Sequence, residues 1–282
     1  MTFTTYNHVT IPALMYGTAW KEGTTSTLVE LAVSSGFTAI DTANQIIHYR
    51  EALVGEALLT LAEKGVSRES LFLQTKFTSV GGQDHRTPYD PTADPATQVT
   101  QSFESSLTHL HTSYVDAYVL HGPSSRMGLS SSDWAIWKAL EGIYQAGHAK
   151  MIGISNVNAH QLQQLCEQAA IKPMVVQNRC FAMMGWDHDV RTVCRAYDIV
   201  YQGFSLLTAN QHVLPHPEVH AMAERLSVTP AQVLFRFALQ VGMLPLTGTT
   251  SAQHMKEDLH ILDGFELTSD EVTRLEMINM SV

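Results

Sequence analysis

The sequence has few cysteines, few charged side chains and no long apolar run. Its only cysteines are Cys166, Cys180 and Cys194, an odd and scattered set that is typical of reduced thiols. Residues 1–6 contain no basic stretch followed by an apolar segment, as a secretory signal would. No apolar stretch approaches the roughly 20 residues that a membrane-spanning helix requires. We therefore expect a cytoplasmic protein without a membrane partner.

Basic residues are also scarce. The chain has 17 Lys and Arg against 27 Asp and Glu, which gives a formal net charge of −10. A nucleic-acid surface needs a basic patch, so this balance argues against nucleic acid as a partner. It leaves room for an anionic cofactor, because backbone N–H groups at a helix N-terminus hold phosphate without a basic side chain.

Short apolar runs that end abruptly in polar residues recur along the 282 residues. Between them lie segments with helical periodicity, such as 25–35, 51–64, 96–110, 134–145 and 230–240. Strands that alternate with helices at this spacing indicate parallel pairing through crossover helices. The eight candidate strands are 14–17, 37–40, 71–75, 115–120, 151–154, 174–176, 199–204 and 243–247.

Eight such strands predict an α/β fold of the (β/α)8 TIM-barrel type. A Rossmann sheet would require a Gly-x-Gly-x-x-Gly turn, and the sequence has none. Residues 3–11 predict a short β-hairpin at the barrel bottom. The long polar connections 78–95 and 122–133 are typical of lids or substrate walls. A domain boundary within 78–95 would leave neither half with a full set of strands, so we expect a single domain of residues 1–282.

Polar residues directly follow several of the predicted strands. Asp41, Lys76 and His121 come immediately after the second, third and fourth apolar runs. The carboxyl ends of barrel strands form the rim at which active sites are built. One polar residue there is usually a solvated strand end, whereas a succession around the rim indicates a site. The succession continues with Ser155, Asn156, Gln177, Asn178 and Ser205.

These residues belong to a series that resembles the aldo-keto reductase family. The resemblance covers essentially the whole chain and implies NAD(P)H-dependent reduction of an aldehyde or ketone to an alcohol. The matching segments are Gly36-Phe37, Asp41-Thr42-Ala43, His48-Tyr49, Gly55-Glu56-Ala57, Thr75-Lys76, Leu120-His121, Gly153-Ile154-Ser155-Asn156 and Val176-Gln177-Asn178.

The resemblance implies a catalytic tetrad of Asp41, Tyr49, Lys76 and His121, with Tyr49 as the proton donor. Hydride transfer to a carbonyl leaves negative charge on oxygen, which needs a proton and hydrogen-bond donors. A free Tyr, with a pKa of about 10, is a reluctant donor at neutral pH. We expect Lys76 to lower that pKa, Asp41 to hold Lys76, and His121 to orient the carbonyl oxygen.

The proton-donor position has an alternative. Family members typically place the Tyr five residues after the Asp, where this chain has Ile46, whereas Tyr49 lies eight residues on. A longer loop would bring Tyr49 to the same place, and His48 is the neighbour that would otherwise occupy it. Trp20, after the first strand, resembles a substrate-pocket aromatic beside Tyr49 and His121.

The family pattern also implies a cofactor site. Ser155, Asn156 and Gln177 are expected to bind the nicotinamide carboxamide. Phe204 is expected to stack on the nicotinamide ring, with barrel core as the alternative for this side chain. Further contacts are expected from Gly17, Thr18 and Asp41, and along the pyrophosphate from Ser205 and Leu207.

Residues 248–258 begin a helix with good N-cap residues, and its free amides form a natural phosphate seat. Many relatives carry a Lys and an Arg that bind the adenosine 2′-phosphate, where this chain has Gly248 and His254. Neutral His binds phosphate less strongly than bidentate Arg. The resemblance implies NADPH, and these departures make NADH an open alternative. The expected contacts are Gly248, Thr249, Thr250, His254, Glu257 and Asp258.

Other features have two interpretations. Trp186, Phe77 and the segment 122–133 are either walls of the substrate pocket or packing residues. His188 lies between two aspartates but lacks a third ligand, so we expect a helix start there and no metal site.

Two other functions remain on the same fold. A cofactor-binding regulatory subunit, as in potassium channels, is disfavoured because the whole tetrad is present. A lyase or isomerase is disfavoured by the Ser155, Asn156 and Gln177 set. The sequence indicates no oligomeric state.

Overall fold

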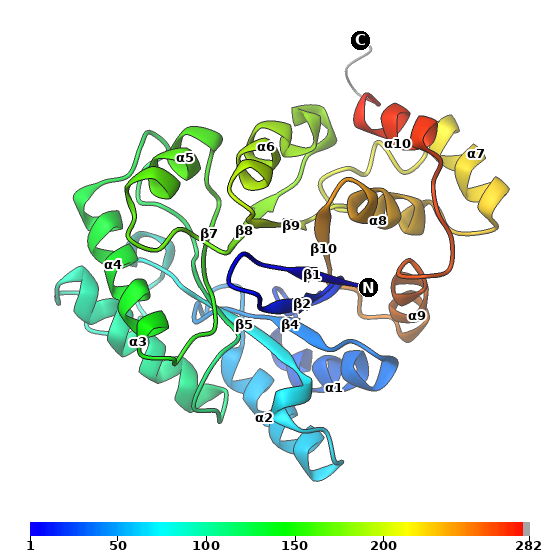
Figure 1. The fold of residues 1–282 in the computed structure, drawn as a ribbon. Coiled ribbons are helices and arrows are strands. Elements are labelled where there is room, and N and C mark those ends of the chain that lie inside the picture. The colour runs from blue at the N-terminus through cyan, green and yellow to red at the C-terminus, as the bar shows by residue number, and fades with distance from the viewer. Residues whose placement is uncertain (279–282) are drawn as a thin grey trace.

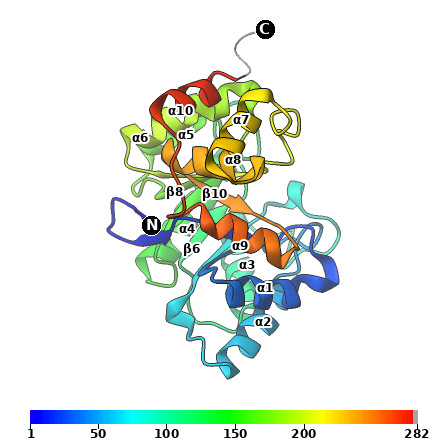
Figure 2. The ribbon, with the colours of Figure 1, turned by 90° about the vertical axis from the view of Figure 1, so that its right-hand side faces the viewer.

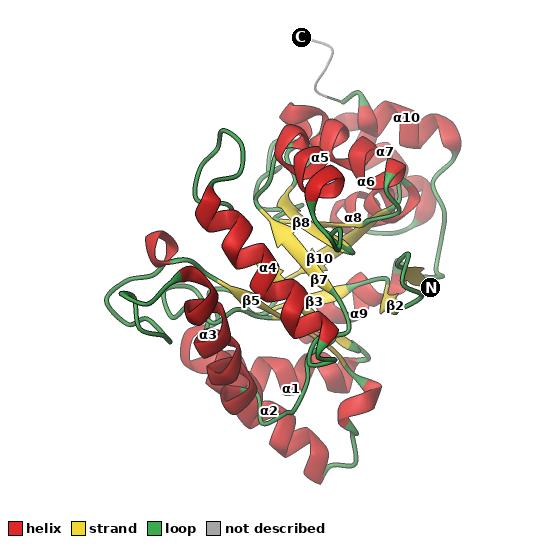
Figure 3. Ribbon diagram, turned by 60° about the vertical axis from the view of Figure 1, so that its left-hand side comes forward, coloured by secondary structure: helices red, strands yellow, loops and turns green. Residues whose placement is uncertain are grey.

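Eight parallel strands close into a barrel in the computed structural model, which describes residues 1–278. The hydrogen-bonded order is β10-β3-β4-β5-β6-β7-β8-β9, and helices surround the strands (Figures 1 and 3). The predicted (β/α)8 fold is confirmed, and all eight predicted strands are present with small differences at their ends. They are β3 (Met15–Gly17), β4 (Ala39–Asp41), β5 (Phe72–Phe77), β6 (Ala117–Leu120), β7 (Ile152–Ser155), β8 (Val175–Arg179), β9 (Val200–Phe204) and β10 (Met243–Thr247).

Helices connect successive strands on the outside of the barrel. The connection after β9 carries two of them, and α10 follows the last barrel strand and α9 (Figure 2). The helices are α1 (Thr25–Ser35), α2 (Glu51–Glu63), α3 (Pro95–His109), α4 (Ser131–Gln145), α5 (Ala159–Gln168), α6 (His188–Ala196), α7 (Pro217–Leu226), α8 (Pro230–Gln240), α9 (Ala252–His260) and α10 (Ser269–Glu276). Short 3-10 turns are η1 (Glu22–Thr24), η2 (Arg68–Ser70), η3 (Val80–Gly82) and η4 (Ala182–Asp187).

The amino-terminal residues form the predicted hairpin. β1 (Thr2–Thr4) pairs antiparallel with β2 (Thr10–Pro12). The Tyr6 hydroxyl donates to the Lys172 carbonyl at 2.6 Å, and Asn7 Nδ2 donates to the Lys150 carbonyl at 3.0 Å. Both acceptors precede barrel strands, so the hairpin covers the amino-terminal end of the barrel, in the centre of Figure 1. The opposite end is left for the site.

The packing of α2 against α3 depends on a glycine, Gly55, in α2. A Cβ built on Gly55 would lie 1.8 Å from the carbonyl oxygen of His109. The two helices therefore approach more closely than any other residue at position 55 would permit. Because α2 follows the segment that carries Tyr49, this contact also fixes one end of that segment. Among residues 1–278, none of the helices combines the length and hydropathy needed to cross a membrane.

Candidate active site

A buried ion pair lies at the carboxyl end of the barrel. Lys76 Nζ donates to both carboxylate oxygens of Asp41, each at 2.7 Å, and to the Thr42 carbonyl at 2.8 Å. The Lys76 side chain is fully buried. All three ammonium hydrogens are therefore used, which is the condition under which a buried charge is tolerated.

Three buried glutamine side chains from β5, β8 and β9 surround this pair. Gln74 and Gln177 each donate to Asp41 Oδ1, at 2.8 and 3.0 Å. Both also donate to Gln202 Oε1, at 2.8 and 3.0 Å. Since this uses both hydrogens of the Gln177 side-chain amide, its side-chain oxygen Oε1 faces away, and within residues 1–278 no donor reaches Oε1. An N–H group of a ligand therefore has an acceptor there.

Tyr49 is carried by the segment between β4 and α2. Gln45 Nε2 donates to the Gly82 carbonyl and Gln83 Nε2 donates to the Asn44 carbonyl, each at 2.8 Å. The Tyr49 amide then bonds the Gln45 carbonyl at 3.0 Å. The first turn of the long connection after β5 thus braces the segment that delivers Tyr49.

The phenol and the imidazole meet edge to face. The ring centroids of Tyr49 and His121 are 5.9 Å apart, and Lys76 Nζ lies 5.1 Å from the centre of the Tyr49 ring. Within the described residues, the Tyr49 hydroxyl has no hydrogen-bond partner. His48 instead stacks on Trp20, with centroids 4.1 Å apart. Tyr49, and not His48, therefore contacts the Lys76 and His121 side chains.

Burial dominates the proton affinities at this site. It lowers the pKa of the His121 imidazole to about 3, with further lowering by Lys76 and His48. It raises the pKa of the Tyr49 phenol, as does the negative charge of Asp41. The expected lowering of the Tyr49 pKa by Lys76 is wrong, because the Lys76 charge is compensated by Asp41 and the phenol is desolvated. At neutral pH the phenol holds its proton and the imidazole is neutral.

Thr78 and Asn156 hold His121 from two sides. The Thr78 hydroxyl lies 2.7 Å from His121 Nδ1. Asn156 Nδ2 donates to the backbone carbonyl of His121 at 2.8 Å. With the Thr78 hydroxyl as donor to Nδ1 the ring proton lies on Nε2, and with Nδ1 as donor the proton lies on Nδ1.

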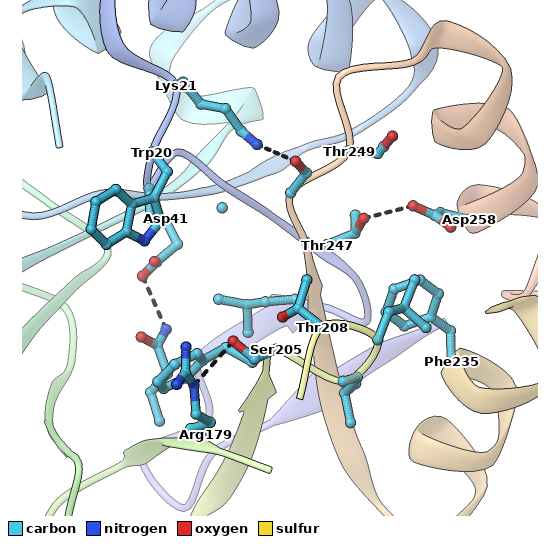
Figure 4. A pocket seen from close by; sticks show the side chains of 18 of the residues that line it. Trp20, Lys21, Asp41, Arg179, Ser205, Thr208, Phe235, Thr247, Thr249 and Asp258 are labelled. Carbon is cyan, nitrogen blue, oxygen red and sulfur yellow. Dashed lines mark hydrogen bonds between the residues drawn. The ribbon is translucent and has the colours of Figure 1, made fainter. Parts of the chain in front are cut away.

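A cavity of about 780 Å³ extends across the barrel mouth from these residues (Figure 4). Its volume lies within the roughly 300–1,000 Å³ range of ligand sites. Phe204 is half-buried and lines the cavity, so it is not barrel core. The predicted residues that line it are Gly17, Trp20, Asp41, His48, Tyr49, His121, Ser155, Gln177, Phe204, Ser205, Leu207, Gly248, Thr249, His254, Glu257 and Asp258.

Four predicted site residues lie away from the cavity wall. Thr18 and Lys76 are fully buried behind it. Asn156 is exposed and does not line the cavity, but its Nδ2 donates to the His121 carbonyl at 2.8 Å and to the Ser155 hydroxyl at 3.1 Å. Thr250 is exposed beyond the rim. For Thr18, Asn156 and Thr250 these positions lie outside the lining expected of cofactor contacts, whereas Lys76 was expected to act through Tyr49.

The alternative pocket walls are packing residues. Trp186 is fully buried and donates through Nε1 to the Leu275 carbonyl at 2.8 Å. Phe77 is likewise fully buried. Within residues 1–278, neither the segment 122–133 nor the segment 78–95 contributes to the cavity lining. The interpretation of these two long connections as substrate walls is therefore wrong for this cavity.

The far end of the cavity is formed by the start of α9. The Ser251 side chain caps this helix by accepting from the His254 amide at 3.3 Å, as the sequence predicts. Asp258 Oδ2 accepts from the Thr247 hydroxyl at 2.7 Å, and burial raises the pKa of Asp258 to about 6. This end presents the Thr247 and Thr249 hydroxyls and the Asp258 carboxylate (Figure 4).

Two cations of the cavity were missed by sequence reasoning. Lys21 Nζ donates to the Gly248 carbonyl. The sequence could have indicated Lys21, because it directly follows the predicted pocket residue Trp20. Arg179 lies two residues beyond Gln177 on the same strand, and therefore on the same face. The start of α8 also lines the cavity, through Thr229 and Ala231. The sequence did not indicate these residues, because a long connection separates them from β9. The other missed lining residues are Ala19, Leu206, Thr208, Phe235, Leu246 and Thr247.

α6 begins at His188, as expected, with Asp187 as its N-cap residue. The Asp187 carboxylate accepts from Asn178 at 2.8 Å and from Tyr201 at 2.8 Å. Among the residues that the structure describes, no group of three His, Cys, Asp or Glu side chains is arranged to hold a metal ion.

Barrel, rim residues and cavity together define a barrel oxidoreductase, and comparison with known proteins identifies the family. The Aldo/keto reductase family matches residues 14–280. An uncharacterized oxidoreductase, YtbE, of Bacillus subtilis is 32% identical over 89% of this chain and 82% of its own length. Glyoxal reductase of the same organism is 30% identical over the same shares. The structure of the aldose reductase from Schistosoma japonicum superposes with a TM-score of 0.85 at 25% identity, covering 100% of this chain and 93% of that one. The chain belongs to the aldo/keto reductase family of oxidoreductases.

Proposed function

We propose that this protein reduces an aldehyde or ketone to an alcohol with a reduced nicotinamide dinucleotide, NADPH or NADH. One observation carries the proposal. A protonated phenol without a partner and a neutral imidazole meet beside a buried Asp–Lys pair, at one end of a cavity of cofactor size. The bound dinucleotide would supply the hydride, and the chain's own residues supply the proton and the orientation.

Tyr49 is the proposed proton donor. Tyr49 lines the cavity and its phenol keeps its proton at neutral pH, so it is in the state required to protonate a carbonyl oxygen as charge develops there. The phenolate left behind lies beside Lys76, whose ammonium is 5.1 Å from the ring centre. Because Asp41 compensates the Lys76 charge, the pKa of Tyr49 stays raised, and the phenol gives up its proton only to the strongly basic oxygen that hydride transfer creates.

His121 is the proposed second donor. Its pKa keeps the ring neutral across the working pH range, and in the tautomer that we propose the Thr78 hydroxyl donates to Nδ1 and the ring proton lies on Nε2. A neutral imidazole donates a hydrogen bond to the carbonyl oxygen without adding a full charge to the site. Asp41 holds Lys76 in place and opposes the lowering of the Lys76 pKa by burial.

The residues present fit a nicotinamide dinucleotide. The free side-chain oxygen Oε1 of Gln177 would accept from a carboxamide N–H, and Phe204 suits stacking against the ring. The Ser155 hydroxyl donates its hydrogen to the Gln177 backbone carbonyl and would meet the carboxamide as an acceptor. Ser205 and Leu207 would follow the diphosphate, and the start of α9 would receive the adenosine end. We propose NADPH on the family pattern. Gly248 and His254 weaken the 2′-phosphate site, so NADH is the second candidate.

The test is reduction by purified protein over a panel of aldehydes and ketones, with NADPH and NADH in separate series. We expect loss of the reduced-nicotinamide absorbance that depends on the carbonyl, and the ratio of kcat/KM for the two cofactors gives the preference. A protein that binds both cofactors but oxidises neither across the panel would act as the regulatory subunit, and the proposal would be wrong.

A further inference from the structure

Arg179 presents an uncompensated positive charge to the cavity. It is the last residue of β8, lies exposed and lines the cavity wall. Its Nε donates to the Ser205 hydroxyl at 3.3 Å, and its guanidinium carbon lies 5.9 Å from the centre of the Phe204 ring. Within residues 1–278 it forms no ion pair with a carboxylate. The terminal NH2 groups are therefore available to a ligand.

The register of the sheet gives the position of Arg179 along the barrel axis. Gln177 pairs with Gln202, and one pleat further towards the rim Arg179 pairs with Phe204. Alternate residues of a strand share a face, so Arg179 stands directly above the glutamine layer. A guanidinium at this place matches an oxyanion such as phosphate or carboxylate, which it binds through two parallel hydrogen bonds.

We infer that Arg179 binds the diphosphate of the dinucleotide cofactor. This inference rests on the proposed function. Arg179 ends β8, and Ser205 and Gly248 directly follow the strands β9 and β10 next to it. Tyr49 and His121 follow β4 and β6 on the other arc of the barrel. The guanidinium thus lies on the side proposed for the cofactor, and the carboxylate of an anionic substrate is the competing source of the oxyanion.

The charge distribution along the cavity supports the same assignment. The second half of α9 contributes Glu257 and Asp258 to the lining, and Lys256 is exposed outside it. Besides Arg179, the cavity lining includes one other Lys or Arg among the described residues, Lys21, on the opposite side in Figure 4. A diphosphate between these two cations would be neutralised by side chains from β8 and from the loop after β3, without a basic residue on α9.

The experiment measures dissociation constants with Arg179→Met and Arg179→Lys. NADH, NADPH, ADP-ribose and adenosine are titrated by fluorescence or calorimetry, which needs no turnover. The matched control is Arg195→Met, since Arg195 is also exposed and bonds only a hydroxyl, that of Thr192 at 2.9 Å, outside the cavity. We expect Arg179→Met to weaken NADH, NADPH and ADP-ribose by about 10- to 100-fold, as for a lost charged hydrogen-bond pair.

Adenosine has no phosphate, so its dissociation constant should be the same in all four proteins. Arg179→Lys should fall between wild type and Arg179→Met, because it keeps the charge and loses the paired geometry. Unchanged ADP-ribose binding in Arg179→Met would overturn the inference. The inference would also be overturned if Arg179→Met left cofactor binding unchanged and raised only the KM for a carboxylate-bearing aldehyde, compared with an uncharged aldehyde of equal size. A wild-type protein that binds no dinucleotide would overturn the proposed function as well.

Discussion

His121 shows how one side chain makes the stability of this protein depend on pH. Burial lowers its pKa to about 3 in the folded chain, against about 6.5 when unfolded. Between these values the unfolded chain binds the extra proton, so stability rises with pH through this window and falls as the solution is acidified. The same low pKa keeps the ring neutral for its proposed role.

The prediction compares wild type with His121→Gln at pH 7.5 and pH 5. Wild type should lose about 1 kcal/mol more unfolding free energy than the variant between these pH values. This is about half of the loss expected for a His ring fully shielded from solvent, because His121 lines the cavity and is partly screened by water. Denaturant unfolding measures the difference, and equal losses in both proteins would contradict the assigned pKa.

Single residues also show what the sequence reveals. Asp41, Lys76 and His121 were predictable because each directly follows an apolar strand, and parallel strands bring their carboxyl ends to one rim. Arg179 lies one pleat beyond Gln177, and nothing local distinguishes it from a solvated strand end. Its lack of a carboxylate partner depends on which side chains the closed barrel brings near, and the sequence does not give that.

At the scale of elements, the long connection after β5 has a role that its composition did not indicate. Its polar, Gly-rich start is typical of a lid, but Gly82 and Gln83 instead bond the segment that carries Tyr49. Loop composition predicts exposure and length, whereas hydrogen-bond partners depend on the tertiary fold. The same segment explains how Tyr49, further along the chain than in typical relatives, reaches Lys76.

Gly55 tests the contact between α2 and α3. Alanine is the better helix former, so local propensity alone predicts that Gly55→Ala stabilises the protein. A Cβ 1.8 Å from the His109 carbonyl oxygen reverses the sign. We expect a loss of about 2 kcal/mol through overpacking, measured by denaturant unfolding.

The control is Gly142→Ala in α4, where a Cβ would have no neighbour within 4 Å. This exposed helix position should gain about 0.5–1 kcal/mol from the same substitution. If both variants were stabilised, α2 and α3 would not be packed as closely as described.

At the scale of the whole molecule, closure of the barrel joins the two halves of the cavity. The arc of β4 to β6 brings Tyr49, Lys76 and His121 together, and the arc of β8 to β10 brings Phe204 and the α9 start beside them. Strand count and alternation were sufficient to predict this architecture. The strand ends shifted because edge residues such as Phe37 lie outside the ladder but are still buried.

The most direct test of the account is Tyr49→Phe, compared with His48→Gln. Removal of the Tyr49 hydroxyl breaks no hydrogen bond within residues 1–278, so folding and NADPH binding should be unchanged. Loss of a general acid should lower kcat for carbonyl reduction by about 100-fold or more, while His48→Gln should keep most of the wild-type kcat. A Tyr49→Phe protein with the wild-type kcat would contradict the central claim that this phenol donates the proton.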